Sequence, residues 1–166
     1  MLAYLLSDAL GDFDELIENG IRLKFVGDLE FFGAKMVARM RRAEEKTGGG
    51  DAMLLNVALN YGGRWDIAQA VSRLPPAAGQ WDDEQLQREI AGRLQVRESD
   101  LLIRTGGHAR ISNFLLWQLS YAELYFTDTL WPDFDQAAFQ RALDWFAQCR
   151  RKFGKTPAQL KRGRAG

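Results

Sequence analysis

The fold is decided by residues 100–114, which read Asp-Leu-Leu-Ile-Arg-Thr-Gly-Gly-His-Ala-Arg-Ile-Ser-Asn-Phe. The apolar triplet 101–103 predicts a short buried strand that ends at Arg104, and the Gly-Gly pair predicts a turn directly after it. Ser112 then predicts the N-cap of a helix that runs to about Ser120. A strand, a turn and a helix in this order are typical of α/β folds with a parallel sheet.

The rest of the chain repeats this alternation of helices and strands. Hydrophobic periodicity predicts helices over 1–18, 33–47, 65–74, 82–94 and from 135 onward, and strands over 21–25, 52–59 and 124–126. The run over 52–59 is almost uniformly apolar, which predicts a central strand buried on both faces. We therefore expect an α/β fold with a single layer of mainly parallel β-sheet flanked by helices. Because no repeat or linker is visible, residues 1–166 are expected to form a single domain, with a basic disordered tail over about 157–166.

Composition limits the classes of protein and partner. The chain has 22 Lys+Arg and 22 Asp+Glu, so its bulk charge recruits neither nucleic acid nor an acidic membrane, and anion binding must come from a local group of cations. The single cysteine, Cys149, excludes an intramolecular disulfide and is interpreted as a packing residue rather than a reactive thiol. No signal peptide is visible, and no apolar run approaches the roughly 20 residues that span a bilayer. We expect a cytoplasmic protein.

The residues around the Gly-Gly turn form a candidate anion site. Ligands of parallel α/β sheets bind outside the carboxyl ends of the strands, which is where Arg104 is predicted to lie. The two glycines let the backbone approach a ligand, and a helix beginning at Ser112 would add unpaired N–H groups. Together with Arg110 these groups suit a diphosphate, at on the order of 1.5–3 kcal/mol per charged hydrogen bond. The alternative is that both arginines pair with carboxylates of the fold.

Five blocks of this chain occur together, in the same order and spacing, in one known family. They are Phe-Val-Gly-Asp at 25–28, Asn-Tyr-Gly-Gly-Arg at 60–64, the stretch 100–118, Tyr-Ala-Glu-Leu-Tyr-Phe at 121–126 and Leu-Trp-Pro-Asp-Phe at 130–134. Together they resemble the cis-prenyltransferases, and the last three resemble the C-terminal signature of undecaprenyl diphosphate synthases. The resemblance extends over nearly the whole chain.

The resemblance implies an isoprenyl transferase that condenses isopentenyl diphosphate with an allylic diphosphate to make polyprenyl or undecaprenyl diphosphate. The residues implied to bind the diphosphate of isopentenyl diphosphate are Arg104, Arg110, Ile111 and Ser112. Glu123 is implied to bind Mg2+, with a contribution from across a dimer. The implied assembly is a homodimer or a heteromer with a full-length prenyltransferase. No nucleic acid is expected as a partner, and membrane contact is expected through the lipid product only.

Two departures from the family pattern affect this interpretation. The family usually has Glu-His after the Gly-Gly pair, where this chain has His-Ala at 108–109, and we assign His108 no catalytic role. Neither the Asp-Gly-Asn-Gly-Arg-Trp loop nor the Ser-x-Glu-Asn-Trp segment of the family occurs in the sequence. We therefore expect a partial domain, lacking the first third of a family chain, with no catalytic residue of its own. The alternatives are an inactive subunit that binds diphosphate or a full-length partner, and a truncated gene product or mis-assigned start codon.

Overall fold

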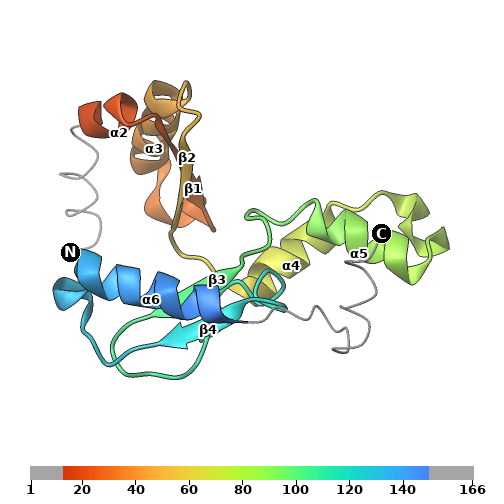
Figure 1. The fold of residues 1–166 in the computed structure, drawn as a ribbon. Coiled ribbons are helices and arrows are strands. Elements are labelled where there is room, and N and C mark those ends of the chain that lie inside the picture. The colour runs from red at the N-terminus through yellow and green to blue at the C-terminus, as the bar shows by residue number, and fades with distance from the viewer. Residues whose placement is uncertain (1–12, 150–166) are drawn as a thin grey trace, which may run out of the picture. The chain divides into compact units, whose positions relative to one another are not determined.

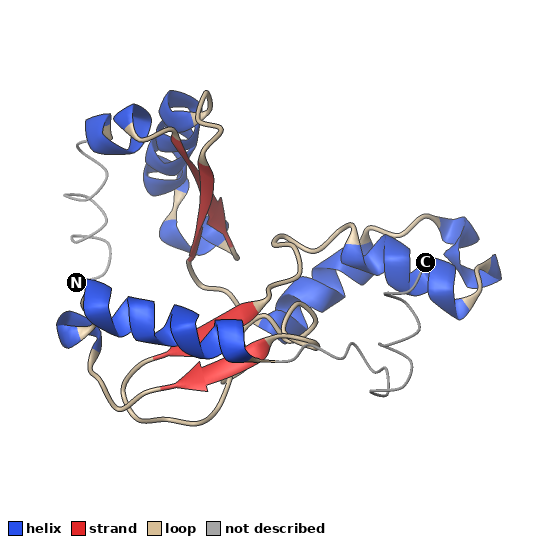
Figure 2. Ribbon diagram, in the orientation of Figure 1, coloured by secondary structure: helices blue, strands red, loops and turns tan. Residues whose placement is uncertain are grey.

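The computed structural model describes residues 13–149 of the chain. These residues divide into two compact units that meet in the sequence between Arg97 and Glu98. Each unit contains one pair of parallel strands with helices packed beside it (Figures 1 and 2). The first twelve residues of the predicted first helix and the predicted basic tail lie outside the described residues.

The elements follow the predicted alternation closely. The first unit contains α2 (Asp14–Glu18), β1 (Ile21–Val26), the 3-10 helix η1 (Leu29–Phe32), α3 (Ala34–Thr47), β2 (Met53–Ala58), α4 (Gly63–Ser72), the 3-10 helix η2 (Pro76–Gln80) and α5 (Asp83–Ala91). The second unit contains β3 (Leu101–Arg104), β4 (Glu123–Phe126), the 3-10 helix η3 (Trp131–Asp133) and α6 (Gln136–Gln148). The predicted α/β class with parallel strands is confirmed. The single domain over 1–166 stays a prediction.

The core of the first unit lies between α3 and β1. On α3, Met40 and Ala43 are fully buried, as the helical spacing of apolar residues predicts. On β1, alternate side chains at Leu23 and Phe25 point to the same core, so the strand is apolar on that face. The buried cluster comprises Phe13, Leu23, Phe25, Leu29, Met40, Ala43 and Leu59.

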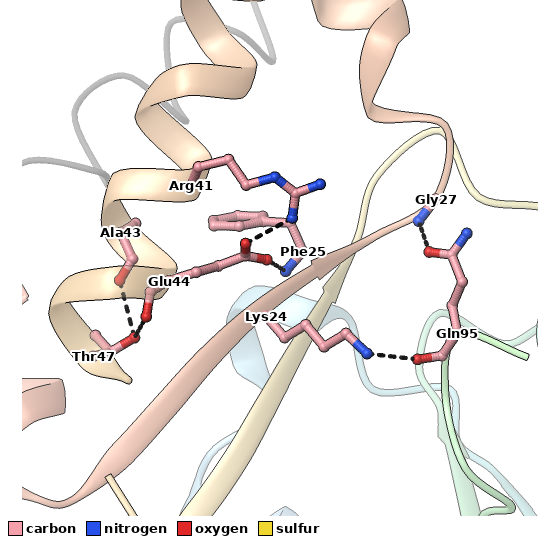
Figure 3. A network of polar contacts seen from close by, with 8 residues as sticks. All are labelled: Lys24, Phe25, Gly27, Arg41, Ala43, Glu44, Thr47 and Gln95. Atoms are coloured by element: carbon pink, nitrogen blue, oxygen red, sulfur yellow. Dashed lines mark hydrogen bonds and ion pairs between the residues drawn. The ribbon is translucent and has the colours of Figure 1, made fainter. Parts of the chain in front are cut away.

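The outer edge of β1 is closed by side chains rather than by another strand. In a strand, every second N–H group points away from a given neighbour, and these groups need other acceptors. Here α3 and the segment after α5 supply them, and Figure 3 shows two of the three bonds. The donor and acceptor pairs are Leu23 N–H to Thr47 Oγ1 at 3.0 Å, Phe25 N–H to Glu44 Oε1 at 2.7 Å and Gly27 N–H to Gln95 Oε1 at 2.7 Å.

The prediction that residues 52–59 form a strand is confirmed, but the prediction that both of its faces are buried is wrong. Met53, Leu54 and Leu55 of β2 are 50%, 43% and 38% exposed. The physical reason is that, within residues 13–149, β2 pairs on one side only, with β1. In the first unit, α3 packs mainly against β1 rather than against β2.

The carboxyl end of the β1–β2 pair is fixed by a close approach of two backbones. Gly27 has φ +117°, and a Cβ at this position would lie 2.0 Å from the carbonyl oxygen of Leu59. Asn60, at φ +46°, accepts a hydrogen bond from the N–H of Asp28 at 3.3 Å. Only glycine fits at residue 27, because any side chain there would overlap the main chain of the next strand.

Asp66, in the first turn of α4, is buried near the same end of the sheet and connects two segments there by hydrogen bonds. Its side chain is completely buried. One carboxylate oxygen accepts a hydrogen bond from the Tyr61 hydroxyl at 2.8 Å, and the other accepts one from the Gln95 N–H at 3.2 Å. A buried carboxylate is tolerated here because hydrogen bonds satisfy both of its oxygens.

In the second unit, β3 and β4 pair in parallel and α6 packs on β4. The register places Leu101 opposite Glu123 and Arg104 opposite Phe126. Tyr125 of β4 packs against Trp145 of α6, with ring centroids 5.2 Å apart. In the part of the chain that the structure describes, no helix has the length and apolar composition needed to cross a membrane.

Candidate functional site

The strand end at Arg104 brings together three of the predicted site residues. Arg104 closes β3, and its Nη1 donates hydrogen bonds to the Ser112 hydroxyl at 3.0 Å and to the carbonyl oxygen of Arg110. Arg104 is partly buried, whereas Arg110 and Ser112 are exposed. The Arg104 guanidinium, the Ser112 hydroxyl and the main chain of Arg110 therefore lie at one place. The prediction that the strand ending at Arg104 is buried is wrong, because all four residues of β3 are only partly buried.

The Gly-Gly turn is positioned by the loop that follows β4. Gly106 donates its N–H to the carbonyl oxygen of Thr129 at 2.9 Å, and Gly107 donates to Thr127 at 3.0 Å. The two glycines have φ of +84° and +72°, the left-handed region that glycine adopts without strain. Both glycine N–H groups already have acceptors, so the turn fixes the shape of the site and leaves no N–H group for an anion. The groups left to bind an anion are the arginine side chains and the Ser112 hydroxyl.

The predicted helix from Ser112 to about Ser120 is wrong. Residues 111–120 form a series of turns, and Ser112, Asn113 and Leu115 have φ of +47°, +62° and +46°. Three residues at positive φ cannot continue a helix, whose φ is near −60°. The site therefore has no helix N-terminus.

This strained segment is itself informative. A non-glycine residue at positive φ costs on the order of 1–3 kcal/mol, and such residues cluster at ligand sites. Local bonds hold the segment in place, from the Phe114 N–H to the Ile111 carbonyl and from the Leu119 N–H to the Leu115 carbonyl, each at 2.9 Å. The sequence signal for Ser112 as a cap is also a signal for a turn, because serine and asparagine favour both.

The alternative that the arginines pair with carboxylates is not what the structure shows. Ion pairs in the described residues include those of Arg41, Arg88 and Arg93, and neither Arg104 nor Arg110 is seen to pair with a carboxylate within residues 13–149. The hydrogen bonds of Arg104 to protein use a single nitrogen, Nη1, of a group that carries five N–H donors. Its charge is thus not neutralised by a carboxylate of the described chain, as an anion site requires.

Glu123 does not join this group. It begins β4, opposite Leu101, whereas Arg104 lies opposite Phe126 at the other end of the strand pair. Three residues along a strand correspond to roughly 10 Å. One copy of the chain therefore holds the carboxylate and the arginine at opposite ends of the same two strands.

The neighbour of Glu123 is a residue that the sequence did not connect with it. Burial raises the pKa of the Cys149 thiol above its ordinary value, and the Glu123 carboxylate, which accepts a hydrogen bond from the thiol, raises this pKa further. The thiol also donates to the carbonyl oxygen of Trp145 at 3.5 Å. A protonated thiol is a weak nucleophile. Cys149 is only partly buried, so its interpretation as a packing residue stays a prediction. No sequence signal links positions so far apart.

A magnesium ion would find few protein ligands here. The described residues contain no cluster of three or more His, Cys, Asp or Glu side chains that could hold a metal. Glu123 offers a carboxylate, the oxygen donor that Mg2+ prefers, and Mg2+ is commonly held by one or two carboxylates together with substrate phosphates. The donor chemistry of Glu123 fits this mode of binding.

Comparison with protein families gives a match over residues 1–154 to the family described as "Putative undecaprenyl diphosphate synthase". The chain belongs to this family. It is 51% identical over 146 residues to an isoprenyl transferase of Chromobacterium violaceum, covering 88% of this chain and 58% of that protein. It is 47% identical over 157 residues to a ditrans,polycis-undecaprenyl-diphosphate synthase, (2E,6E)-farnesyl-diphosphate specific, of Shewanella oneidensis, covering 90% of this chain and 57% of the relative.

The fold agrees with solved structures of related enzymes. The crystal structure of lavandulyl diphosphate synthase from Lavandula x intermedia, in complex with dimethylallyl diphosphate, has a TM-score of 0.79 and 30% sequence identity. The similarity covers 93% of this chain and 70% of the plant enzyme. Thus the family resemblance inferred from the sequence is confirmed, and the chain spans somewhat more than half the length of the curated relatives that it matches.

Proposed function

We propose that this chain carries the isopentenyl diphosphate site of a cis-prenyltransferase. The observation that supports this most directly is the contact of Arg104 with Ser112 and the main chain of Arg110 at the carboxyl end of β3. A diphosphate placed at the exposed side of this group would receive charge-assisted hydrogen bonds from the guanidiniums and a neutral one from the hydroxyl. Ile111, between the second arginine and the serine, would fix the spacing of these donors.

The role proposed for Glu123 is to hold Mg2+ together with phosphate oxygens. When bound, this ion would neutralise the charge of the diphosphate that leaves during transfer of the isoprenyl chain. The separation of about 10 Å between Glu123 and Arg104 along the strands favours an arrangement in which the two act in different sites. The assembly that provides this is a homodimer, or a heteromer with a full-length prenyltransferase.

Calorimetric titration of the full chain with isopentenyl diphosphate and with inorganic pyrophosphate tests the diphosphate site. We expect both to bind, and Arg104→Ala to weaken binding by about 10- to 100-fold, because one charged hydrogen bond contributes on the order of 1.5–3 kcal/mol. The control is Arg141→Ala on α6, which removes an exposed arginine charge elsewhere in the second unit. Equal affinities for the two variants would contradict the proposal.

The second candidate function is that of a diphosphate-binding subunit without turnover of its own. The absence from the sequence of the Asp-Gly-Asn-Gly-Arg-Trp and Ser-x-Glu-Asn-Trp motifs favours it. Because transfer depends on holding both diphosphates in line, half of the site is expected to lose most of the rate. Elongation of farnesyl diphosphate with labelled isopentenyl diphosphate and Mg2+ tests whether the chain has turnover of its own. Little product is expected from this chain alone, and robust long-chain product would exclude the second candidate.

A further inference from the structure

The turn that joins α2 to β1 carries the sequence Asn19-Gly20, a pair that no part of the proposed function uses (Figure 1). An asparagine followed by glycine is open to a spontaneous reaction, because glycine has no Cβ to keep its own nitrogen away from the preceding side chain. The chain has three other asparagines, and they precede Val57, Tyr61 and Phe114, whose side chains obstruct this approach. Asn19 is therefore the asparagine of this chain most prone to deamidation.

Two hydrogen bonds keep the reacting groups apart in the folded chain. The Gly20 N–H, whose nitrogen would attack, donates to the Ile17 carbonyl oxygen at 3.0 Å. The side-chain amide of Asn19, whose carbon Cγ would be attacked, donates through Nδ2 to the Glu15 carbonyl oxygen at 2.7 Å. Both acceptors belong to the main chain of α2, so both bonds are lost when the end of α2 unwinds.

α2 is a weakly held element. It has five residues, and none of them is buried. Its contact with the core is through Leu16, which is only partly buried, whereas β1 contributes Leu23 and Phe25 to the buried cluster itself. Helices this short have little stability of their own, and elements with few buried apolar contacts open locally at a small fraction of the free energy of global unfolding. Asn19 therefore becomes reactive when α2 opens, while the β1–β2 pair stays folded.

We propose that Asn19 is a site of spontaneous deamidation, which proceeds through local opening of α2 and weakens the start of the β1–β2 pair. The Gly20 nitrogen bonds to Cγ of Asn19, the Cγ–Nδ2 bond breaks, and Nδ2 leaves as ammonia with the proton of the Gly20 N–H. Water then opens the resulting cyclic imide at either carbonyl. One product is aspartate, and the other is isoaspartate, in which the main chain runs through Cβ and Cγ. The proposal rests on this turn and is independent of the diphosphate chemistry.

The turn has little room for the longer main chain of isoaspartate. The Gly20 carbonyl oxygen accepts from the Ala52 N–H at 3.0 Å and from the Met53 N–H at 3.5 Å, which fixes where the β1–β2 pair begins. A Cβ on Gly50 would lie 2.6 Å from the same oxygen, so the two backbones are already in close contact. An additional main-chain atom on the α2 side of Gly20 must displace Gly20 from these positions. The new carboxylate also lies at the i+4 position relative to Glu15, and like charges at this spacing destabilise a helix.

Mass spectrometry of tryptic peptides tests the site and the role of α2. The full chain and a synthetic peptide of residues 1–22 are incubated at mildly alkaline pH, and the chain is then digested. Trypsin releases the same peptide, in which Asn19 is the only asparagine. We expect the chain to deamidate there about 10- to 100-fold more slowly than the free peptide, because a local opening must precede the reaction. Equal rates, or a chain rate more than about 1,000-fold lower, as global unfolding would give, would overturn the proposal.

A pair of matched substitutions separates the opening of α2 from opening elsewhere. Ile17→Gly on α2 and Val71→Gly on α4 each remove from a helix a β-branched side chain that is 46% exposed. Because glycine weakens a helix, Ile17→Gly should speed deamidation of Asn19 by about two- to fivefold relative to its own free peptide, whereas Val71→Gly should leave the rate unchanged. Equal rates for the two variants would contradict the role of α2. Far-UV circular dichroism verifies that both variants fold, and the measurement on the unaltered chain needs no variant.

Amide hydrogen exchange of the isoaspartyl form, purified after incubation and followed by NMR, tests the consequence for the strands. The Ala52 and Met53 amides should exchange at least about tenfold faster than in the unmodified chain. The Leu59 amide, which donates to the Val26 carbonyl oxygen at the other end of the pair, should keep its rate. Asn19→Ser, which cannot deamidate, is incubated in parallel and should show no change. Unchanged exchange at Ala52 and Met53 would overturn the proposed weakening of the strand pair.

Discussion

The carboxyl ends of β1 and β3 occupy equivalent positions in their two-stranded sheets, but their polar groups have different partners. At the end of β1, the Gly27 N–H donates to Gln95, and the nearby Asp66 carboxylate accepts from Tyr61 and Gln95. At the end of β3, Arg104 contacts only a hydroxyl and a carbonyl oxygen, so its positive charge has no carboxylate beside it within the described residues.

This difference separates a structural strand end from a candidate ligand site. Both ends contain glycines and polar residues, and both satisfy the general rule that ligands bind where parallel strands end. At the end of β1, internal hydrogen bonds satisfy the buried groups, so a ligand there would compete with the fold. At the end of β3, a cationic group faces solvent, so an anion would add bonds without breaking any.

The largest effect expected is a loss of stability when Gly27, at the carboxyl end of β1, is replaced by alanine. Gly27→Ala places a Cβ 2.0 Å from the Leu59 carbonyl oxygen at φ +117°, which should lower the free energy of unfolding by about 3–5 kcal/mol. Gly106→Ala is the control at the β3 end, where φ is also positive but no atom lies within 4 Å, and about 1 kcal/mol is expected. Urea unfolding measures both. Similar losses would remove the proposed contrast between the two ends.

An intermediate effect is expected from Arg104→Lys, which keeps the charge at the β3 end and removes the forked donor. Because lysine cannot reproduce a guanidinium that bonds a hydroxyl, a carbonyl and a diphosphate together, pyrophosphate affinity should fall by about tenfold, less than for alanine. Thermal unfolding should change little, because the site is open to solvent. A lysine variant that binds as well as the natural chain would show that charge alone suffices.

The closure of the β1 edge can be weakened at a single hydroxyl. Thr47 is 2% exposed, and Thr47→Val removes the acceptor of the Leu23 N–H while preserving the shape of the side chain. An unsatisfied buried N–H costs about 1–3 kcal/mol. Denaturant unfolding of Ser72→Ala, at an exposed hydroxyl on α4, is the control and should differ from the natural chain by less than about 0.5 kcal/mol. Equal stabilities would mean that the edge bond contributes nothing.

The smallest effects on stability are expected when one helix N-cap in each unit is removed. Asp82 accepts from the Gln85 N–H at the start of α5, and Asp135 accepts from the Ala138 N–H at the start of α6, each at 2.7 Å. Replacement of either by alanine should cost about 1 kcal/mol. Amide exchange resolved by residue should show faster opening in the unit that carries the change. Equal acceleration in both units would indicate that they unfold together.

The sequence predicted the helices and strands well because their signals are local. The alternation at 21–25, the apolar stripe of α3 and the cap at Asp82 each depend on neighbours within a few residues. The exposure of β2 could not be predicted, because a uniformly apolar run gives the same pattern whether or not its covering elements are present. For the candidate site, the proximity of Arg104 to Ser112 and to the main chain of Arg110 follows from their separation of at most eight residues in the chain, and their role in binding stays a prediction.

Two features of the site required the three-dimensional structure. The turns at 111–120 replace the predicted helix, because serine and asparagine favour both caps and turns and the sequence alone does not discriminate between them. The contact between Glu123 and Cys149 joins the start of a strand to the end of a helix, and nothing in either local sequence indicates it.

The position of Glu123 at the opposite end of the strands from Arg104 has a consequence for inheritance. In the proposed dimer, each complete site takes its arginine from one copy and its carboxylate from the other. A cell with one Arg104→Ala allele and one Glu123→Ala allele would build mixed dimers in which one site has lost both groups and the other has kept both. In a cell that expresses only one of these two alleles, every site lacks either its arginine or its carboxylate. Two alleles of the same gene, each defective when expressed alone, would therefore complement each other.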